Sequence, residues 1–234
     1  MRNVSLAIKH GELSSIIGPN GAGKTTLFNL ITGYIRPDSG RILYYAQPIE
    51  GLAPHTIARM GIGRAFQIPA IFPELSVSEN VRAAVISRLG LSLKFAKEVS
   101  KFRQVRKRVD EILEQVGLLE RADQVAGTLA HGDQKRLDLA IALAMEPSIL
   151  LLDEPTSGMS PEERSHTVSL IKELWERRKL TLVFIEHDMD VVFSISQVVR
   201  VLHYGELIAE GTPDEISRNE RVVEAYLGRE ETSV

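Results

Sequence analysis

The chain has 234 residues, with 28 Lys and Arg against 31 Asp and Glu, so its formal net charge is −3. This balance argues against a general nucleic-acid coat or a binder of anionic membranes, and the absence of Cys excludes disulfides and thiolate metal sites. The hydrophobic content of 44% is ordinary for a soluble globular protein. No apolar run approaches the roughly 20 residues of a membrane-spanning helix, and residues 1–10 are too polar for a secretory signal. We therefore expect a cytoplasmic protein without a nucleic-acid partner.

The first predicted unit is a strand at Leu13–Ile17, a glycine-rich turn, and a helix that begins at Lys24. The turn fits the pattern G-x-x-x-x-G-K-[ST] from Gly18 to Thr25, in the strand-to-helix setting that a phosphate-binding P-loop requires. Glycines let backbone N–H groups approach phosphate oxygens, and the helix N-terminus adds positive potential. We expect Lys24 to reach the β and γ phosphates and the Thr25 hydroxyl to coordinate Mg²⁺. The candidate phosphate-binding residues are Gly18, Pro19, Asn20, Gly21, Ala22, Gly23, Lys24, Thr25 and Thr26.

The next residues predict a short strand and then a helical lobe. Residues 40–45 resemble a strand between two turns, with Gln47 and Pro48 assigned to the second turn. From Val77 to Gly117 the composition shifts to helix formers, and the stretch from about residue 70 to residue 129 is the candidate helical lobe. An apolar stripe at helical spacing comprises Phe102, Val105, Val109, Ile112, Leu113 and Val116. A basic run comprises Lys94, Lys97, Lys101, Arg103, Arg106, Lys107 and Arg108. Because acidic residues interrupt this run, a solvated helix face is a better interpretation than a docking surface for acidic partners.

Buried strands and helices alternate in the second half. Residues 148–153 and 180–185 are continuous apolar runs, as expected for strands buried on both faces of a parallel sheet, and a helix at about 161–179 separates them. Further strands are predicted at 198–202 and 206–209, followed by two short helices within 213–227. This alternation predicts an α/β sheet whose ligand lies beyond the carboxyl ends of its strands.

Polar residues follow both buried strands at this predicted ligand edge. Asp153 and Glu154 end the first run, and Glu186, His187 and Asp188 follow the second. Adjacent side chains at a strand end point in different directions, so one carboxylate can hold a metal while the other addresses a water. We assign Asp153 to Mg²⁺ and Glu154 to polarising the attacking water.

Four further motifs follow the P-loop in a fixed order: Gln67 within GRAFQ, then LAHGDQKR, LLLDEPTSGM and FIEHD. With these motifs the chain resembles the ATP-binding-cassette (ABC) ATPases over nearly its whole length. The resemblance implies one ABC cassette domain over residues 1–234, with an α/β P-loop NTPase fold. Its parts would be a RecA-like core at about 1–69 and 130–234, an inserted helical subdomain at about 70–129, and a small antiparallel β region. ATP and Mg²⁺ would be bound in a head-to-tail dimer, each ATP lying between the P-loop of one subunit and the signature helix of the other.

The resemblance also implies roles for single residues. Gln67 matches the glutamine that senses Mg²⁺, and His187 matches the histidine that contacts the γ-phosphate, so both join Glu154 as catalytic candidates. The family signature Leu-Ser-Gly-Gly-Gln is replaced here by Leu129 followed by Ala130, His131, Gly132 and Asp133. Backbone N–H groups and the helix N-terminus remain available to the phosphate, but one hydroxyl is lost, which we expect to weaken dimer closure by about tenfold. Ser160 is a second departure, because many members carry Asp there.

Several segments narrow the resemblance to one group of cassettes. These are GRAFQIPAIFPELSVSENV, EPTSGMSPEE, FIEHDMDVV and GELIAEGTPDEISRNERVVEAYLG. They resemble the ATP-binding subunits of importers for branched-chain amino acids and related amides or urea. The implied partners are a second ABC ATPase subunit, identical or of similar type, transmembrane permease subunits and, indirectly, a solute-binding protein. The implied location is peripheral, on the cytoplasmic face of the inner membrane.

Two alternatives remain open from the sequence. An ABC ATPase of the lipopolysaccharide-export type would share the short C-terminal tail and differ in its permeases. A soluble ABC ATPase that works on nucleic acid or ribosomes would usually carry two fused cassettes or a long coiled-coil insertion. Neither feature is found in this sequence.

Overall fold

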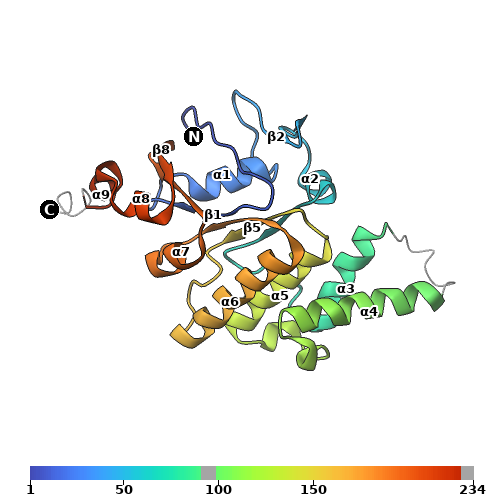
Figure 1. Cartoon of the computed structure of the whole chain (residues 1–234). Helices are drawn as coiled ribbons and strands as arrows, with labels where there is room; N and C mark the ends of the chain where they lie inside the picture. Colours follow the sequence, from blue (N-terminus) through green and yellow to red (C-terminus); the bar gives the residue numbers. More distant parts are fainter. Residues whose placement is uncertain (91–98, 228–234) are drawn as a thin grey trace.

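The computed structural model of the chain describes residues 1–90 and 99–227, which form a central sheet with helices on both faces (Figure 1). Within these ranges the sheet has the strand order β4-β5-β6-β1-β7-β8, and only β8 is antiparallel to its neighbour. The strands are β1 (Leu13–Ile17), β4 (Ile62–Ala65), β5 (Ile149–Asp153), β6 (Thr181–Ile185), β7 (Val198–His203) and β8 (Glu206–Gly211). Strand β6 is buried at every residue and β5 at all but the first, which explains their unbroken apolar sequences.

Alternating side chains along these strands face two separate hydrophobic clusters. Leu151 and Val183 pack on one face with α1 (Lys24–Ile31) and α2 (Pro54–Met60). Leu150, Leu152 and Phe184 pack on the other face. The helices on that face are α5 (His131–Ala144), α6 (Pro161–Arg178) and α7 (Met189–Ile195). Figure 1 shows α1 and α2 above the sheet and α5, α6 and α7 below it.

The predicted helical lobe contains α3 (Val77–Arg88) and α4 (Val99–Gln115), both packed against α5. Short 3-10 turns follow at Leu119–Arg121 and Ala126–Thr128. Five residues of the predicted stripe are confirmed as buried: Val105, Val109, Ile112, Leu113 and Val116. Arg103, Arg106 and Lys107 are exposed, as expected of a solvated face. The side chains of Phe102, Lys94, Lys97 and Lys101 lie outside the described residues.

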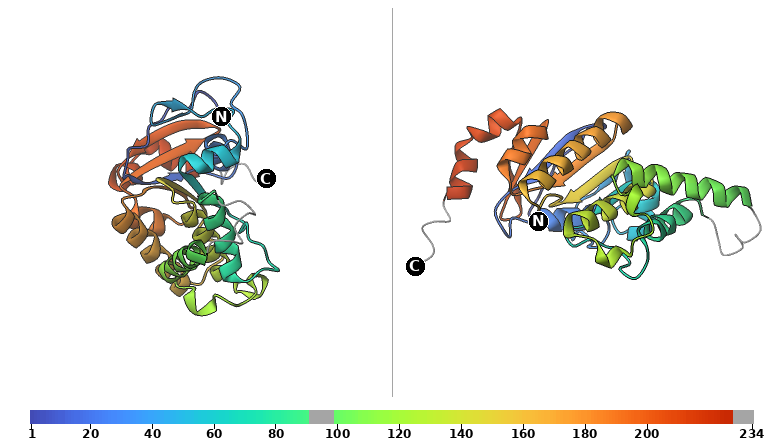
Figure 2. Two further views of the ribbon diagram at one scale, coloured as in Figure 1. Left: turned by 90° about the vertical axis from the view of Figure 1, so that its right-hand side faces the viewer. Right: turned by 90° about the horizontal axis from the view of Figure 1, so that it is seen from below.

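The opposite end of the sheet carries α8 (Pro213–Ser217) and α9 (Glu220–Leu227), which confirm the two predicted short helices. Both pack on β8, and Figure 2 shows them far from α3 and α4. In the part of the chain that the structure describes, no helix combines the length and apolar character needed to cross a membrane.

Two expectations for the first half were wrong. The strand expected at 40–45 is reduced to β2 (Leu43–Tyr44), and Gln47–Pro48 is not a turn but strand β3, antiparallel to β2. Tyr45 and Ala46 have φ values of 46° and 63°, so they form the two-residue turn between these strands. The sequence also gave no prediction for β4, because Gly63 and Arg64 interrupt its apolar pattern, nor for α2 and α7.

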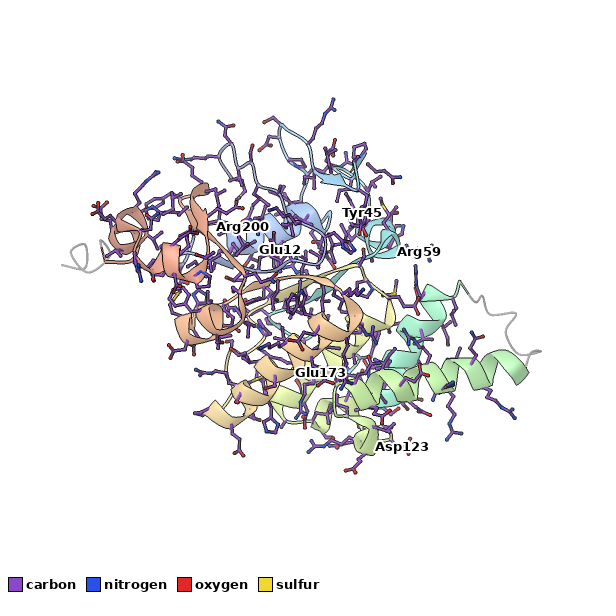
Figure 3. All side chains as sticks on the ribbon, viewed as in Figure 1. Glu12, Tyr45, Arg59, Asp123, Glu173 and Arg200 are labelled. Carbon is purple, nitrogen blue, oxygen red and sulfur yellow. The ribbon has the colours of Figure 1, made fainter. Side chains whose placement is uncertain are left out.

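A buried ion pair fixes the start of β1. Arg200 Nη1, from β7, donates to Glu12 Oε1 at 2.7 Å, and Arg200 Nη2 donates to the carbonyl oxygen of Ala7 at 2.6 Å. Both charged side chains are almost fully buried, and Figure 3 shows them side by side. Because Glu12 directly precedes β1, this pair anchors the strand that leads into the P-loop.

Candidate functional site

The P-loop turns sharply from β1 into α1. Gly18, Gly21 and Gly23 have φ values of 149°, 81° and 103°, which residues with a side chain rarely adopt. Lys24 begins α1 and is only 7% exposed. Its Nζ donates to the carbonyl oxygens of Gly18 at 2.6 Å and Pro19 at 3.1 Å, so the ammonium group lies against the loop itself. Pro19 and Ala22 are buried, Asn20 and Thr25 are exposed, and Thr26 is half-buried.

The loop is also joined to the hairpin between β7 and β8. The Gly205 N–H donates to the carbonyl oxygen of Ala22 at 2.9 Å. A Cβ added at Gly18 would lie 2.1 Å from the carbonyl oxygen of Leu202, so only glycine fits there. The P-loop therefore rests directly on the end of β7.

Three predicted catalytic residues from neighbouring strands meet at the carboxyl edge of the sheet. Gln67 follows β4, Glu154 follows β5 and His187 follows β6. Gln67 Nε2 donates to Glu154 Oε2 at 2.8 Å, and His187 Nε2 is hydrogen bonded to Glu154 Oε1 at 2.9 Å. Both oxygens of the Glu154 carboxylate are therefore engaged, and a ligand that attracts Gln67 or His187 would release one of them.

Asp153 is buried at the end of β5 beside this group. Arg64 Nη2 donates to Asp153 Oδ2 at 2.8 Å, and the two side chains are 6% and 2% exposed. Burial raises the pKa of Asp153, while the Arg64 guanidinium opposes that rise. The second carboxylate oxygen, Oδ1, is buried without a hydrogen-bond partner among the described residues. Such an oxygen is costly to leave unsatisfied, which fits a site whose remaining ligand comes from outside the chain.

These residues fit a magnesium ion that takes its other ligands from a nucleotide. No three His, Cys, Asp or Glu side chains within the described ranges gather as a ready metal cluster. Mg²⁺ commonly takes one or two carboxylates together with phosphate oxygens and water. Asp153 Oδ1 and the exposed Thr25 hydroxyl are oxygen donors of the kind that it prefers.

Arg64 is a site residue for which the sequence reasoning gave no role. It lies in β4, three residues before Gln67, and its Nη1 donates to Asn29 Oδ1 of α1 at 2.7 Å. The guanidinium also lies over the ring of Phe66, with its carbon 4.8 Å from the ring centre. A single charged residue inside a four-residue buried strand was the available signal.

Helix α5 anchors the turn that carries Glu154. Lys135 is 8% exposed, and its Nζ donates to the carbonyl oxygens of Glu154 at 2.7 Å and Ser157 at 2.9 Å. Burial lowers the pKa of Lys135, against the nearby charges of Glu186, Glu154 and Asp153. Glu186 Oε1 in turn accepts from the backbone N–H of Thr156 at 2.8 Å, so the turn is held from two directions.

The same helix anchors the segment around Gln67. Asp138 is 3% exposed, and its carboxylate accepts from the N–H groups of Phe66 at 2.7 Å and Ala70 at 3.1 Å. Burial raises the pKa of Asp138 to about 6, although both hydrogen bonds and the charge of Arg64 oppose that rise. Lys135 and Asp138 were not predicted as site residues. The sequence feature that could have indicated them is the spacing of two charged residues three positions apart in an apolar helix, because this spacing places both on one face.

The predicted signature residues form the N-terminus of α5. Ala130 and His131 are exposed, whereas Gly132 and Asp133 are buried. Asp133 forms ion pairs with Arg121 and Arg136, so its carboxylate is already engaged within the chain. The His131 ring lies close to Gly158, in the turn after Glu154.

Ser160 has a local structural explanation. It caps α6 in a capping box, in which its Oγ accepts from the Glu163 N–H at 3.3 Å and Glu163 Oε2 accepts from the Ser160 N–H at 2.9 Å. Ser and Asp are both good caps, so the residue that departs from the family pattern preserves the helix start.

Comparisons with known proteins agree with this geometry. The family model described as ABC transporter matches residues 1–157, and a second model, described as branched-chain amino acid ATP-binding cassette transporter, matches residues 206–232. The chain is 43% identical to the high-affinity branched-chain amino acid transport ATP-binding protein LivG of Escherichia coli strain K12, over 97% of this chain and 91% of LivG. It is 32% identical to the lipopolysaccharide export system ATP-binding protein LptB of Haemophilus influenzae, over 97% of this chain and 90% of LptB.

Solved structures show the same fold. The ADP conformation of MJ1267, an ATP-binding cassette of an ABC transporter, superposes with a TM-score of 0.82 at 31% identity, covering 96% of this chain and 91% of that one. The dimeric structure of MJ0796, a bacterial ABC transporter cassette, gives a TM-score of 0.78 at 30% identity, covering 90% of this chain and 89% of that one. The chain therefore belongs to the family of ABC transporter ATP-binding proteins and has the cassette fold that its sequence predicted. Members of this family bind and hydrolyse ATP.

Proposed function

We propose that the chain is the ATP-hydrolysing subunit of a transporter that takes up branched-chain amino acids. The observation that carries this proposal is the 43% identity to LivG over 97% of the chain. The match of residues 206–232 to a branched-chain amino acid cassette model agrees with it. The 32% identity to LptB is lower at equal coverage of this chain, so lipopolysaccharide export is the less favoured alternative.

The P-loop residues would bind the phosphates of ATP. The residues from Gly18 to Thr26, apart from Pro19, which has no N–H, would offer backbone N–H groups in the loop and the first turn of α1. Lys24 would exchange its contacts with two loop carbonyls for the β and γ phosphates. Thr25, Gln67 and Asp153 would hold Mg²⁺, which neutralises charge on the phosphates when bound.

Glu154 would polarise the water that attacks the γ-phosphate. Gln67 and His187 are hydrogen bonded to its two carboxylate oxygens. A nucleotide that draws His187 to its γ-phosphate would leave Oε1 free to accept a hydrogen bond from that water. We propose His187 and Gln67 as the residues that link nucleotide binding to the release of Glu154.

The second subunit would complete the site. The dimeric cassette MJ0796 supports a dimer of this chain, either with itself or with a similar subunit. Ala130, His131, Gly132 and Asp133 would face the ATP of the partner through their backbone and the positive end of α5. The signature serine would donate a hydrogen bond to phosphate, and Ala130 cannot do so. Asp133 is engaged in ion pairs within the chain, whereas His131 is exposed, so its imidazole would donate that hydrogen bond instead.

The helical subdomain would face the permease. We propose that residues 70–129 form this subdomain and that residues 1–69 and 130–234 form the core of a single cassette. Beside Gln67, Ile68 and Phe72 are 84% and 56% exposed, which is typical of a protein contact. Docking there would place the chain peripherally at the cytoplasmic face of the inner membrane, with a solute-binding protein acting from the other side.

Uptake by the reconstituted transporter tests this proposal. The chain, a second ATPase subunit, the permeases and the solute-binding protein would be combined in vesicles, and uptake of labelled leucine and aspartate would be compared. We expect ATP-dependent uptake of leucine and not of aspartate, with no uptake when Glu154→Gln replaces the wild type. ATPase activity that responds to lipopolysaccharide and not to amino acids would overturn the proposal in favour of export.

A further inference from the structure

We infer that Arg64 is the positioning residue for Asp153: its guanidinium holds one carboxylate oxygen and so directs the other toward Mg²⁺. The inference rests on the proposed metal role of Asp153 and adds to it a residue of the GRAFQ segment to which the sequence gave no role. It concerns how the Asp153 carboxylate is oriented by contacts within the chain.

The contact between the two side chains is specific and shielded from water. Arg64 Nη2 lies 2.8 Å from Asp153 Oδ2, and both side chains are at most 6% exposed. Asp153 Oδ1 is buried and has no partner among the described residues. One oxygen of the carboxylate is thus fixed and the other is available, which is the arrangement that a metal ligand requires.

Arg64 is itself held in place by the P-loop helix. Its Nη1 donates to Asn29 Oδ1 at 2.7 Å and to Thr32 Oγ1 at 3.3 Å, both in or directly after α1. The guanidinium also lies over the rings of Phe28 and Phe66. With these contacts fixed, the direction of Nη2 toward Asp153 is also fixed.

The chemistry of the guanidinium explains why arginine suits this position. Its planar group can donate from Nη1 to α1 and from Nη2 to β5 at the same time, and it stays charged when buried. A lysine ammonium would keep the charge but not this two-directional geometry. Arg64 thereby joins the helix after the P-loop, the strand before Gln67 and the strand that ends in Asp153.

The test measures the affinity of the full chain for ATP with Mg²⁺ and with EDTA, in wild type, Arg64→Met, Arg64→Lys and Asp153→Asn. We expect Arg64→Met to retain the wild-type affinity in EDTA and to lose about tenfold or more of the enhancement that Mg²⁺ gives. Arg64→Lys should recover part of that loss. Arg59→Met is the matched control, because Arg59 is an exposed arginine on α2, and it should behave as wild type in both conditions.

The outcomes separate this inference from the proposed function. If Asp153→Asn keeps the full Mg²⁺ enhancement, the metal role of Asp153 is wrong. If Asp153→Asn loses it and Arg64→Met keeps it, Arg64 does not position the carboxylate. Equal losses in EDTA and in Mg²⁺ would show a merely structural role. Should Arg64→Met not fold, Arg64→Lys carries the same test, since it keeps the buried charge and removes only the geometry; unchanged enhancement in that variant would overturn the inference.

Discussion

The P-loop and the signature segment both match ATP-binding motifs, yet this chain preserves them differently. Gly18 to Thr25 fit the motif at every fixed position, and the loop rests on the backbone of β7. The signature segment departs at Ala130, His131 and Asp133, whereas the same helix turns Lys135 and Asp138 inward to hold the segments of Glu154 and Gln67. If the tip of α5 binds phosphate through backbone N–H groups, its side chains can differ from the family signature without loss of those groups. The side chains on the buried face of α5 have partners within the same subunit and are not free to change in this way.

The largest expected effect tests the P-loop half. Lys24→Ala should lower ATP affinity, because it removes the cation proposed to bind the β and γ phosphates, and it should lower turnover by about 100-fold or more. Glu154→Gln should lower turnover by about 100-fold or more while it leaves ATP affinity nearly unchanged. Nucleotide binding by calorimetry and steady-state ATPase activity distinguish the two variants. Retained turnover in Glu154→Gln would disprove the role of its carboxylate.

A pH experiment sharpens the description of the buried side of α5. The pKa of Asp138 is raised to about 6 in the folded chain, so between about pH 4 and pH 6 the folded state binds the proton more tightly than the unfolded state does. This contribution to the free energy of unfolding is largest below pH 4, falls as pH rises through that window, and is lost above pH 6. Its size is on the order of 3 kcal/mol.

The measurement is denaturant unfolding of wild type and Asp138→Asn at several values between pH 4 and pH 7.5. Asn does not titrate, so the difference between the two unfolding free energies should decline across the window by an amount of that order. Asp123→Asn is the control, because Asp123 is exposed on the far side of the helical lobe (Figure 3). A difference that stays constant with pH would exclude Asp138 as the titrating group.

A smaller effect is expected where the signature departs from the family. Ala130→Ser restores the hydroxyl at the exposed tip of α5, and a hydrogen bond to a charged group would strengthen closure by about tenfold. The measurement is ATP-dependent dimerisation, monitored by size-exclusion chromatography, of the Glu154→Gln variant with and without Ala130→Ser. Weaker dimerisation after Ala130→Ser would mean that the tip does not face phosphate.

The smallest effect concerns Ser160. Because Ser and Asp cap helices about equally well, Ser160→Asp should change the free energy of unfolding by only about 0.5 kcal/mol or less. Ser160→Ala should cost about 1 kcal/mol by comparison. Thermal unfolding of the two variants checks the pair. A large loss in Ser160→Asp would show that the position does more than begin α6.

The parts that the sequence predicted best are those where one physical requirement dominates. Strands β5 and β6 are buried on both faces and read as unbroken apolar runs, so their positions were predicted within a residue. Strand β4 was missed because two of its four residues, Gly63 and Arg64, are not apolar. Gly63 packs closely against Pro147 and Arg64 binds Asp153, so neither contributes to an apolar pattern. The turn at Tyr45 and Ala46 was missed because neither residue is typical of positive φ.

The same contrast applies to the site. Residues that would touch the nucleotide follow spacings set by phosphate geometry, and the structure places Gln67, Glu154 and His187 together as that spacing implies. Arg64, Lys135 and Asp138 act through tertiary contacts whose partners lie 19 to 89 residues away in the chain. Only their charge in apolar surroundings indicated them, and charge alone does not identify a partner.

The fit of Gly18 against Leu202 limits how this protein can change over time. A methyl group at position 18 would collide with a carbonyl of β7, so a mutation there must be rescued by movement of a strand instead of a side chain. Any lineage that keeps this sheet is therefore tied to glycine at that position, independently of which solute its transporter carries.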